Sequence, residues 1–360
     1  MARTNATNYS NPNYAYATAD NDAFDRLDVA AQGQAMDVHD HSSGNGVAVA
    51  RVATGALADG SVTNAKLASD TARANLLTNG GFEIWQRGSG PFTAIGGAAV
   101  LYTADRWAAQ LGSGAGNLAV TRVTSGTDRS PTAAQLTYTA GAGDSTVSFH
   151  QQTDSIGDVP FMRWNGPLSL SIRVQCSAAG RARLWWWDGV ASGRQYGSYN
   201  VAVGVMETLS MTFTPAASAT KGYFGIELLA GTSSTVYVDN AMLVVGSQAA
   251  DYAPLHPADD LARCLRYYET LGGSTSIIVR GYASAAGQSL SLLGYYKVRK
   301  VVTPTVTMVG TMTANNSGTI NGINGSTVDS VELLGTSGTA GPWQFFFTNA
   351  SNYLTIEANL

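Results

Sequence analysis

The chain has 360 residues, of which 44% are hydrophobic and only 13% are charged, and its formal net charge is −4. Binding to a phosphate backbone needs a concentrated basic surface, so this charge argues against nucleic acid as a partner. No run of apolar residues is long enough to span a bilayer, and we expect no membrane insertion. The first residues lack the apolar segment of a secretory signal, so we expect the chain to fold in a cytoplasm.

The composition favours an all-β protein. Thr, Val and Tyr favour strands, while the 40 glycines and many asparagines favour tight turns. The two cysteines, Cys176 and Cys264, lie far apart in the sequence and fit neither a zinc motif nor a disulfide framework. We therefore predict two buried thiols.

Residues 1–46 form the first predicted region. A polar arm over residues 1–19 precedes a short amphipathic helix, in which Phe24, Leu27, Ala31 and Ala35 recur at helical spacing. Neither the arm nor the helix can bury enough apolar surface to fold alone, so we expect this region to dock on a larger body. The region ends in the stretch MDVHDHSSGNG.

Residues 47–74 contain two similar units of about ten residues, ATGALADGSV and TNAKLASDTA. Each unit has small residues and one Leu or Val that could pack against a neighbour, and neither unit can bury its apolar face alone. Packing of such units along an axis predicts a stalk. A monomeric linker is the alternative.

Residues 75–256 show the pattern of a β-sandwich. Short alternating runs such as LAVTRVTSG, AAQLTYTAG, LSLSIRVQCSA and KGYFGIELLAG are separated by turn residues. This spacing is typical of an antiparallel sandwich or jelly roll. We expect Trp85 and Trp107 to anchor its core.

Residues 257–360 predict a bridging helix followed by a second β domain. Pro257, just ahead of Asp259 and Asp260, marks the start of the helix. Alternating segments follow as far as NYLTIEA, which reads as a terminal strand.

The aromatic run RARLWWWDG is the strongest candidate for a binding surface. On a strand, Trp185 and Trp187 share one face and Trp186 takes the other, so one face joins the core. The other face offers a platform on which sugar rings stack, with Arg183 and Tyr196 near in sequence to orient them. The alternative is that all three indoles are core or interface residues.

Several of these motifs resemble known viral proteins. HDHSSGNG followed by DGSVTNAKLASDTA resembles the start of many bacteriophage fibre and virion-appendage proteins. NLLTNGGFEIWQRG, TADRW and VYVDNAMLVVG resemble the jelly-roll modules of phage tail proteins and of family 4/9 carbohydrate-binding modules, and LARCLRYYE is typical of the exit helix of the phage versions. The resemblance implies a homotrimeric tail or head appendage, assembled in the host cytoplasm, that binds other virion proteins through its N-terminal region and host surface polysaccharide through its jelly roll.

The resemblance gives the two neighbouring histidines a role. His39 and His41 are two residues apart, so in an extended segment both side chains face the same side. Three chains around a trimer axis then offer six imidazoles to one transition metal such as iron, nickel or zinc, as in phage fibres and spike tips. The alternative is a solvated turn capped by Asp37, Asp40 and Ser42.

A second metal site is implied by the resemblance to the carbohydrate-binding modules, whose opening and closing segments meet around a structural calcium. The matching positions are Glu83 and Asp239, with Asn79 and Asn240 adjacent. Hard oxygen ligands from two distant segments suit calcium. A plain hydrogen bond between the segments is the alternative.

Catalysis finds little support, and we predict that the chain is not an enzyme. No nucleophile motif accompanies His150, and the regular repeats of a β-helical depolymerase are missing from the sequence. The sequence therefore favours a trimeric virion fibre or spike. A polysaccharide depolymerase tailspike and a non-viral monomeric carbohydrate-binding protein are the alternatives.

Overall fold

The computed structural model describes residues 74–97, 100–124, 130–153, 166–190, 193–219, 221–272, 278–347 and 351–359. These residues belong to one compact unit that spans Thr63–Leu360. The predicted arm and short helix of residues 1–46, with His39 and His41, lie outside the described residues. The predicted stalk lies outside them as well, up to residue 73.

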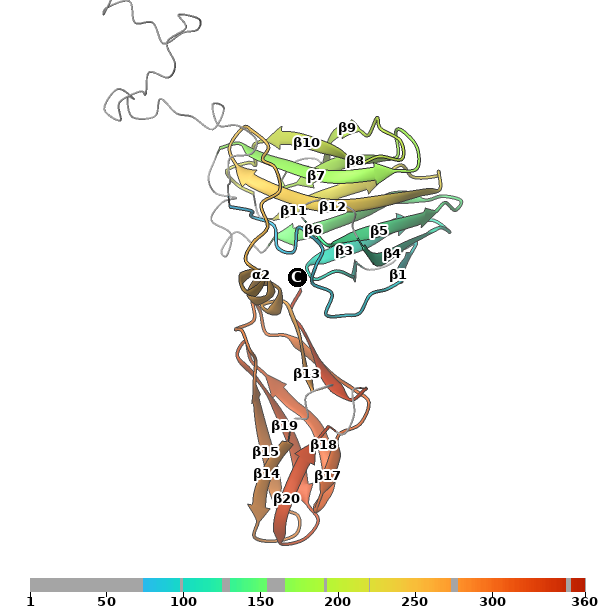
Figure 1. Ribbon diagram of the computed structural model, residues 1–360. Coiled ribbons are helices and arrows are strands. Elements are labelled where there is room, and N and C mark those ends of the chain that lie inside the picture. Colours follow the sequence, from blue (N-terminus) through green and yellow to red (C-terminus); the bar gives the residue numbers. More distant parts are fainter. Residues whose placement is uncertain are drawn as a thin grey trace, which may run out of the picture. The chain divides into compact units, whose positions relative to one another are not determined.

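The larger part of the described chain is a β-sandwich (Figure 1). Its first sheet has six strands in the order β1-β4-β5-β12-β7-β10, and its second has six in the order β2-β3-β6-β11-β8-β9. The first sheet comprises β1 (Phe92–Ile95), β4 (Asn117–Thr124), β5 (Thr132–Thr139), β12 (Ser234–Val245), β7 (Leu168–Cys176) and β10 (Glu207–Phe213). The second comprises β2 (Leu101–Tyr102), β3 (Trp107–Ser113), β6 (Ser145–Thr153), β11 (Gly222–Leu228), β8 (Ala182–Trp187) and β9 (Gln195–Tyr199).

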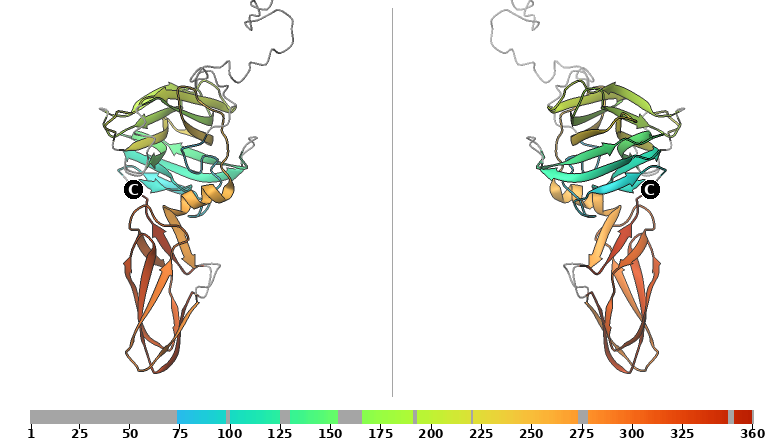
Figure 2. Two further views of the ribbon diagram at one scale, coloured as in Figure 1. Left: turned by 90° about the vertical axis from the view of Figure 1, so that its left-hand side faces the viewer. Right: turned by 90° about the vertical axis from the view of Figure 1, so that its right-hand side faces the viewer.

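Every strand pairing in the sandwich is antiparallel, and the chain passes repeatedly from one sheet to the other, as in a jelly roll. The two layers are visible edge-on in Figure 2. The alternation of side chains along each strand explains the packing, because every second residue enters the space between the sheets. Phe82, Trp107 and Phe149 stack together at the centre of this core, with ring centroids 4.8 to 5.8 Å apart.

Three predictions about buried residues are confirmed. Trp107 is fully buried, and Trp85 packs against the same core from a partly buried position. Cys176 and Cys264 are both buried free thiols. The fold class is also confirmed, since the described chain is β-structure apart from one α-helix.

The predicted bridging helix is α2 (Pro257–Leu265), with Pro257 in its first turn and His256 as its N-cap. Beyond it, nine strands form three sheets of three: β13-β21-β16, β14-β20-β17 and β15-β19-β18. Trp343, Phe345 and Ile356 are buried in the separate core of this second β domain. The strands are β13 (Tyr268–Gly272), β14 (Ile278–Ala283), β15 (Ser289–Tyr295), β16 (Thr305–Val309), β17 (Thr313–Asn315), β18 (Ser317–Ser326), β19 (Ser330–Ser337), β20 (Gly341–Phe346) and β21 (Tyr353–Glu357).

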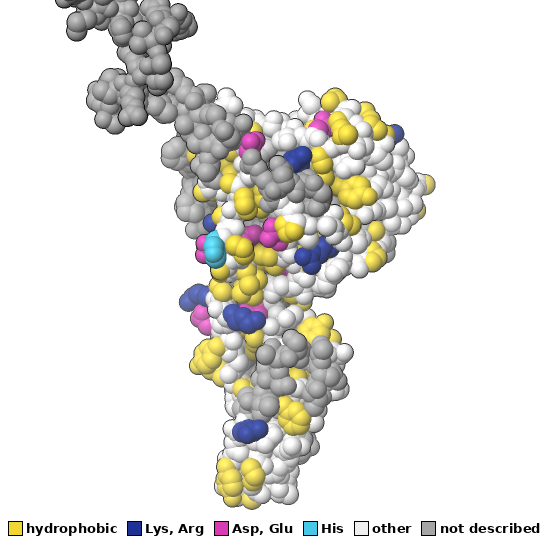
Figure 3. Space-filling view, viewed as in Figure 1, with side chains coloured by type: hydrophobic (Ala, Val, Ile, Leu, Met, Phe, Trp, Pro, Cys, Tyr) yellow, Lys and Arg dark blue, Asp and Glu magenta, His cyan; other side chains and the backbone are white. Residues whose placement is uncertain are grey.

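The surface carries few charges. On the face drawn in Figure 3, uncharged polar side chains and backbone predominate, and the charged groups are scattered. This agrees with a chain in which 13% of the residues are charged. No helix among the described residues is long and apolar enough to cross a membrane.

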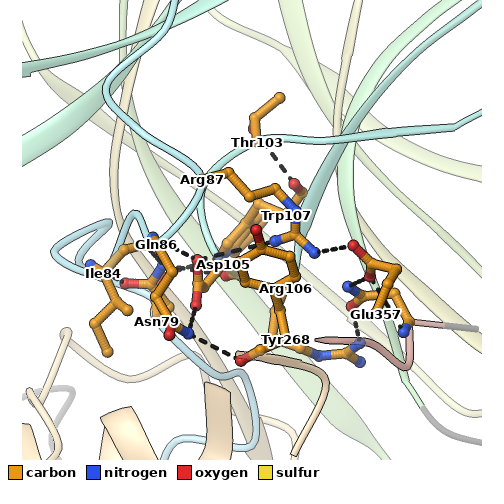
Figure 4. A network of polar contacts seen from close by, with 11 residues as sticks. Asn79, Ile84, Gln86, Arg87, Thr103, Asp105, Arg106, Trp107, Tyr268 and Glu357 are labelled. Carbon is orange, nitrogen blue, oxygen red and sulfur yellow. Dashed lines mark hydrogen bonds and ion pairs between the residues drawn. The ribbon is translucent and has the colours of Figure 1, made fainter. Parts of the chain in front are cut away.

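Two arginines of the sandwich bind the second β domain (Figure 4). The Arg87 guanidinium lies 3.7 Å from the ring centroid of Tyr268 and forms a 2.6 Å ion pair with Glu357. The Arg106 guanidinium lies 3.4 Å from the ring centroid of Tyr267. These contacts place both guanidinium groups against aromatic faces, so charge and packing act together. We call this region, between the sandwich and the second β domain, the joint.

Candidate functional site

Strand β8 divides its aromatic residues between the two faces of its sheet, as predicted. Leu184 and Trp186 enter the sandwich core, where the Trp186 ring stacks on Phe213 at 4.2 Å. Trp185 and Trp187 alternate with them and lie on the outer face of the second sheet. The outer face of β8 is therefore available for a site that the core does not occupy.

Strand pairing brings the four predicted binding residues together on this outer face. Trp185 pairs with Tyr196 of β9, and Trp187 pairs with Tyr223 of β11. The next outward position of β8, Arg183, pairs with Glu227. We call the resulting group the aromatic–arginine cluster; it consists of Arg183, Trp185, Trp187, Arg194, Tyr196, Tyr223 and Glu227.

Glu227 is the electrostatic centre of the cluster. Its carboxylate accepts hydrogen bonds from Arg183 at 2.6 Å, from Arg194 at 3.2 Å and from the Tyr196 hydroxyl at 3.3 Å. The two guanidinium groups also lie on aromatic faces, Arg183 at 3.6 Å from the ring centroid of Tyr196 and Arg194 at 3.7 Å from that of Trp185. Two cations thus share one carboxylate, which leaves the cluster with a positive charge.

The prediction that Trp185 forms an open platform is wrong. Its side chain is only 1% exposed, because Arg194 covers its ring. The Trp185 indole N–H donates to the backbone carbonyl of Ile226 at 3.1 Å, and its ring meets His150 in a T-shaped contact at 5.3 Å. Trp185 therefore supports the cluster from beneath and holds Arg194 in place.

Gly225 makes this buried layer possible. It lies opposite Trp185 on one side and His150 on the other. A Cβ atom at position 225 would lie 2.7 Å from the His150 Cβ and 2.2 Å from the Phe149 carbonyl oxygen, which real side chains do not tolerate. The imidazole is fully enclosed, and burial together with the Arg194 charge lowers the pKa of His150 to about 3.

Three other rings of the cluster reach solvent. Trp187 and Tyr223 are half-buried and stack on one another, with centroids 5.5 Å apart and planes 26° from parallel. Tyr196 is 43% exposed. Burial and the neighbouring Glu227 carboxylate raise the pKa of Tyr196, so its hydroxyl stays protonated and can donate hydrogen bonds.

Arg194, Tyr223 and Glu227 were not predicted from the sequence. Tyr223 and Glu227 alternate with Gly225 in the run KGYFGIELLAG, which places them on one face of a strand. Nothing local in the sequence shows that this strand pairs with β8 or that the face is the outer one. The alternation therefore indicates that these residues share a face, but not which strand lies beside them.

Asp260 is a third carboxylate near the two residues predicted to bind calcium, Glu83 and Asp239. Asp239 is fully buried, and its side chain accepts a hydrogen bond from the backbone N–H of Asn240 at 2.7 Å. Burial is the main cause of the raised pKa of Glu83, and the nearby charges of Asp260 and Asp239 raise it further. Within the described ranges, no three His, Cys, Asp or Glu side chains are grouped so that they could hold a metal ion. Calcium at Glu83 and Asp239 stays a prediction.

No protein-family model matches the chain, and no curated protein matches it either. Among solved structures, the chain is similar to the CBM22-1 xylan-binding domain from Paenibacillus barcinonensis, with 15% identity, coverage of 51% of this chain and 100% of that one, and a TM-score of 0.33. It is also similar to the enzymatically active domain of a tailspike protein of bacteriophage CBA120, with 11% identity, coverage of 48% and 21%, and a TM-score of 0.30. A cyclase from Fischerella sp. TAU has 14% identity, coverage of 49% and 98%, and a TM-score of 0.34. Likenesses this low carry no argument about function.

Proposed function

We propose that this chain is a non-enzymatic carbohydrate-binding protein of a virion, a homotrimeric fibre or spike that adsorbs to host surface polysaccharide through the aromatic–arginine cluster. One observation carries the binding proposal. The stacked Trp187–Tyr223 pair and the exposed Tyr196 ring share one face with the hydrogen-bonding side chains of Arg183 and Glu227.

The chemistry of this face suits a sugar chain. The apolar C–H faces of pyranose rings stack on aromatic rings, and a few fixed polar groups set their orientation. Trp187 and Tyr223 supply the aromatic surface, and Arg183 and Glu227 hold one another rigidly at its side. The positive charge left by two arginines around one carboxylate favours a glycan that carries acidic groups.

The virion part of the proposal is supported by the sequence. The resemblance of HDHSSGNG and DGSVTNAKLASDTA to phage appendage proteins gives the N-terminal region its role in attachment to other virion proteins and in trimer formation. His39 and His41 would bind a transition metal on the trimer axis, and Glu83 and Asp239 would contribute to a structural calcium site.

A depolymerase is the weaker alternative. Glycoside hydrolysis uses two carboxyl groups, roughly 5 to 9 Å apart. Within the aromatic–arginine cluster, Glu227 is the single carboxylate of the described residues, and it is held by two guanidinium groups. This arrangement favours binding over proton transfer.

Binding is tested on an array of bacterial surface polysaccharides with the full chain and three variants. We expect Trp187→Ala and Tyr223→Ala each to lose most of the signal, because each removes half of the stacked pair. Stacking of a sugar ring on one aromatic side chain is worth a few kcal/mol. We therefore expect each variant to lose about tenfold or more in affinity. Tyr237→Ala is the matched control, since Tyr237 is a half-buried tyrosine of β12 in the other sheet. Unchanged binding in both cluster variants would refute the site.

The assembly is tested by light scattering of the purified full chain, with and without a strong chelator. We expect the mass of a trimer, and we expect chelation to loosen that trimer if His39 and His41 hold a metal. A trimer that is indifferent to chelator would contradict the metal site alone. A monomer under both conditions would contradict the fibre and leave a monomeric sugar-binding protein.

A further inference from the structure

The sheet β15-β19-β18 of the second β domain carries a single charged residue, Glu332 of β19 (Figure 1). Both oxygens of its carboxylate are held by neighbouring side chains. Ser291 on β15 donates from Oγ to Oε1 at 2.6 Å, and Asn324 on β18 donates from Nδ2 to Oε2 at 2.7 Å. We propose that this outward surface is a second glycan-binding site, which takes a neutral sugar residue. We call it the Glu332 face; it consists of Ser291, Leu293, Tyr295, Asn324, Glu332 and Leu334.

Strand alternation places apolar side chains beside the carboxylate. Leu292 packs against the core, whereas Leu293 and Tyr295 of the same strand point outward and are 47% and 70% exposed. Leu293 pairs directly with Glu332, and Leu334 is the next outward residue of β19. The fixed acceptor therefore lies between apolar groups, with an aromatic ring at one end of the row.

Two glycines leave the third strand of this face open. Gly325 lies opposite Glu332, and Gly322 lies opposite Leu334. A Cβ atom at either glycine would meet no heavy atom within 4 Å among the residues that the structure describes. A flat ring can therefore lie over β18 and approach the carboxylate from that side.

The carboxylate determines the class of ligand. The hydrogen bonds from Ser291 and Asn324 lower the pKa of Glu332, so the group is ionised at neutral pH and only accepts hydrogen bonds. Each oxygen has a further lone pair for a ligand hydroxyl. Ser291 and Asn324 are exposed and Glu332 is half-buried, so such a hydroxyl can reach the carboxylate from solvent. Oriented acceptors beside apolar and aromatic surface suit a pyranose ring.

The charged groups that follow in the chain leave this negative charge in place. Beyond the end of β15, Arg299 and Asp329 form an ion pair at 3.5 Å, and the Lys297 ammonium lies 3.9 Å from the buried Glu269. The pKa of Glu332 is set by its hydrogen bonds and by burial rather than by these charges. The Glu332 face therefore favours a neutral sugar over a uronic acid, which is the opposite of the preference proposed for the aromatic–arginine cluster.

The site is tested by NMR of the full chain with isotope-labelled leucine methyl groups. The probes are the methyl glycosides of glucose, galactose, mannose and N-acetylglucosamine, and Leu293→Met and Leu334→Met assign the two resonances. We expect at least one glycoside to shift the Leu293 and Leu334 methyl resonances until they saturate. Because both leucines lie on the Glu332 face, a sugar bound at the aromatic–arginine cluster does not interfere with this measurement.

Two variants and a matched control locate the contacts. Glu332→Gln replaces one acceptor oxygen by a donor, and we expect it to bind the same glycoside about tenfold more weakly. Tyr295→Ala removes the aromatic surface and should weaken binding about threefold or more. Tyr282→Ala is the control, because Tyr282 is 72% exposed but lies on β14 in another sheet of the same domain. These are surface substitutions, so all three proteins should melt like the parent.

The two proposed glycan sites can fail separately. Methyl resonances that shift without any binding on the polysaccharide array would refute the cluster and support the Glu332 face, and array binding without such shifts would do the reverse. The proposal for the Glu332 face is also overturned if Glu332→Gln binds as well as the parent, or if Tyr282→Ala weakens binding as much as Tyr295→Ala. Tighter binding of methyl glucuronide than of methyl glucoside, read from the same two resonances, would contradict the preference for a neutral sugar.

Discussion

The enclosed imidazole of His150 connects the cluster to the stability of the whole sandwich. His150 pairs with Gly225 beneath the Trp185 ring, and its pKa is lowered from 6.5 to about 3 by burial and by Arg194. The unfolded chain binds a proton here below pH 6.5, whereas the folded chain stays neutral. Falling pH therefore favours the unfolded state, and stability that is present above pH 6.5 is lost between 6.5 and 3.

His150→Phe tests this linkage, because it keeps an aromatic ring beside Trp185 and removes the titration. We expect the parent to lose stability relative to the variant by about 1.4 kcal/mol per pH unit below pH 6. Urea unfolding of both proteins between pH 7 and pH 4 measures the difference, since all carboxylates titrate equally in the two chains. Parallel pH profiles would show that His150 takes up its proton as readily in the folded chain as in the unfolded chain, and would contradict the lowered pKa.

At the level of single residues, the candidate site was only partly predictable from the sequence. The alternation in RARLWWWDG placed Trp185 and Trp187 on one face, and the structure agrees. The burial of Trp185 was not predictable, because its cover comes from Arg194, a side chain outside the strand. Local periodicity identifies the face of a residue but not what lies above it.

At the level of the elements, one buried ion pair links α2 to β13. Lys300 and Glu269 are both fully buried, with their charged groups 2.6 Å apart. The Lys300 ammonium also donates to the backbone carbonyl of Leu265, in the last turn of α2, where helices favour a cation. The pair thus binds the end of the helix to the start of the second β domain.

Lys300→Met should destabilise this domain strongly, because it removes the buried cation from Glu269 and leaves the exposed Lys297 ammonium, 3.9 Å away, as its remaining ion-pair partner. We expect a loss of about 3 to 5 kcal/mol in the free energy of unfolding. The double variant with Glu269→Gln should lose clearly less than Lys300→Met alone, since the buried charge is then gone. Denaturant unfolding of the parent, both single variants and the double variant measures the coupling, and strictly additive losses would contradict it.

The elements themselves were well predicted where their signals are local. The start of α2 followed from Pro257 with acidic residues behind it, and the terminal strand β21 (Tyr353–Glu357) lies in the segment NYLTIEA. The strand order was not predictable. β21 pairs with β13 and β16, and β12 lies between β5 and β7, so the partners are far apart in the sequence and no local pattern selects them.

Over the whole described chain, the joint in Figure 4 decides whether the sandwich and the second β domain unfold together. Each has its own core, so each could unfold separately if the joint were weak. Arg87 and Arg106 are both largely buried at the joint, where they bind Glu357 and the rings of Tyr268 and Tyr267. Because these contacts combine charge, hydrogen bonding and aromatic packing, they couple the two cores more strongly than an exposed ion pair would.

We therefore expect the parent to show one cooperative transition in scanning calorimetry and the double variant Arg87→Met, Arg106→Met to show two. Methionine keeps much of the apolar contact with the tyrosine rings, so the change reports mainly the lost charge and hydrogen bonds. Arg280→Met is the control, because Arg280 is an exposed residue of β14 away from the joint, and it should leave the single transition intact. A single transition in the double variant would mean that the contacts left in place are sufficient to couple the two cores, among them the hydrogen bonds from Gln86 Nε2 to the Tyr268 carbonyl at 3.0 Å and from the Asn79 N–H to Asp260 at 2.8 Å.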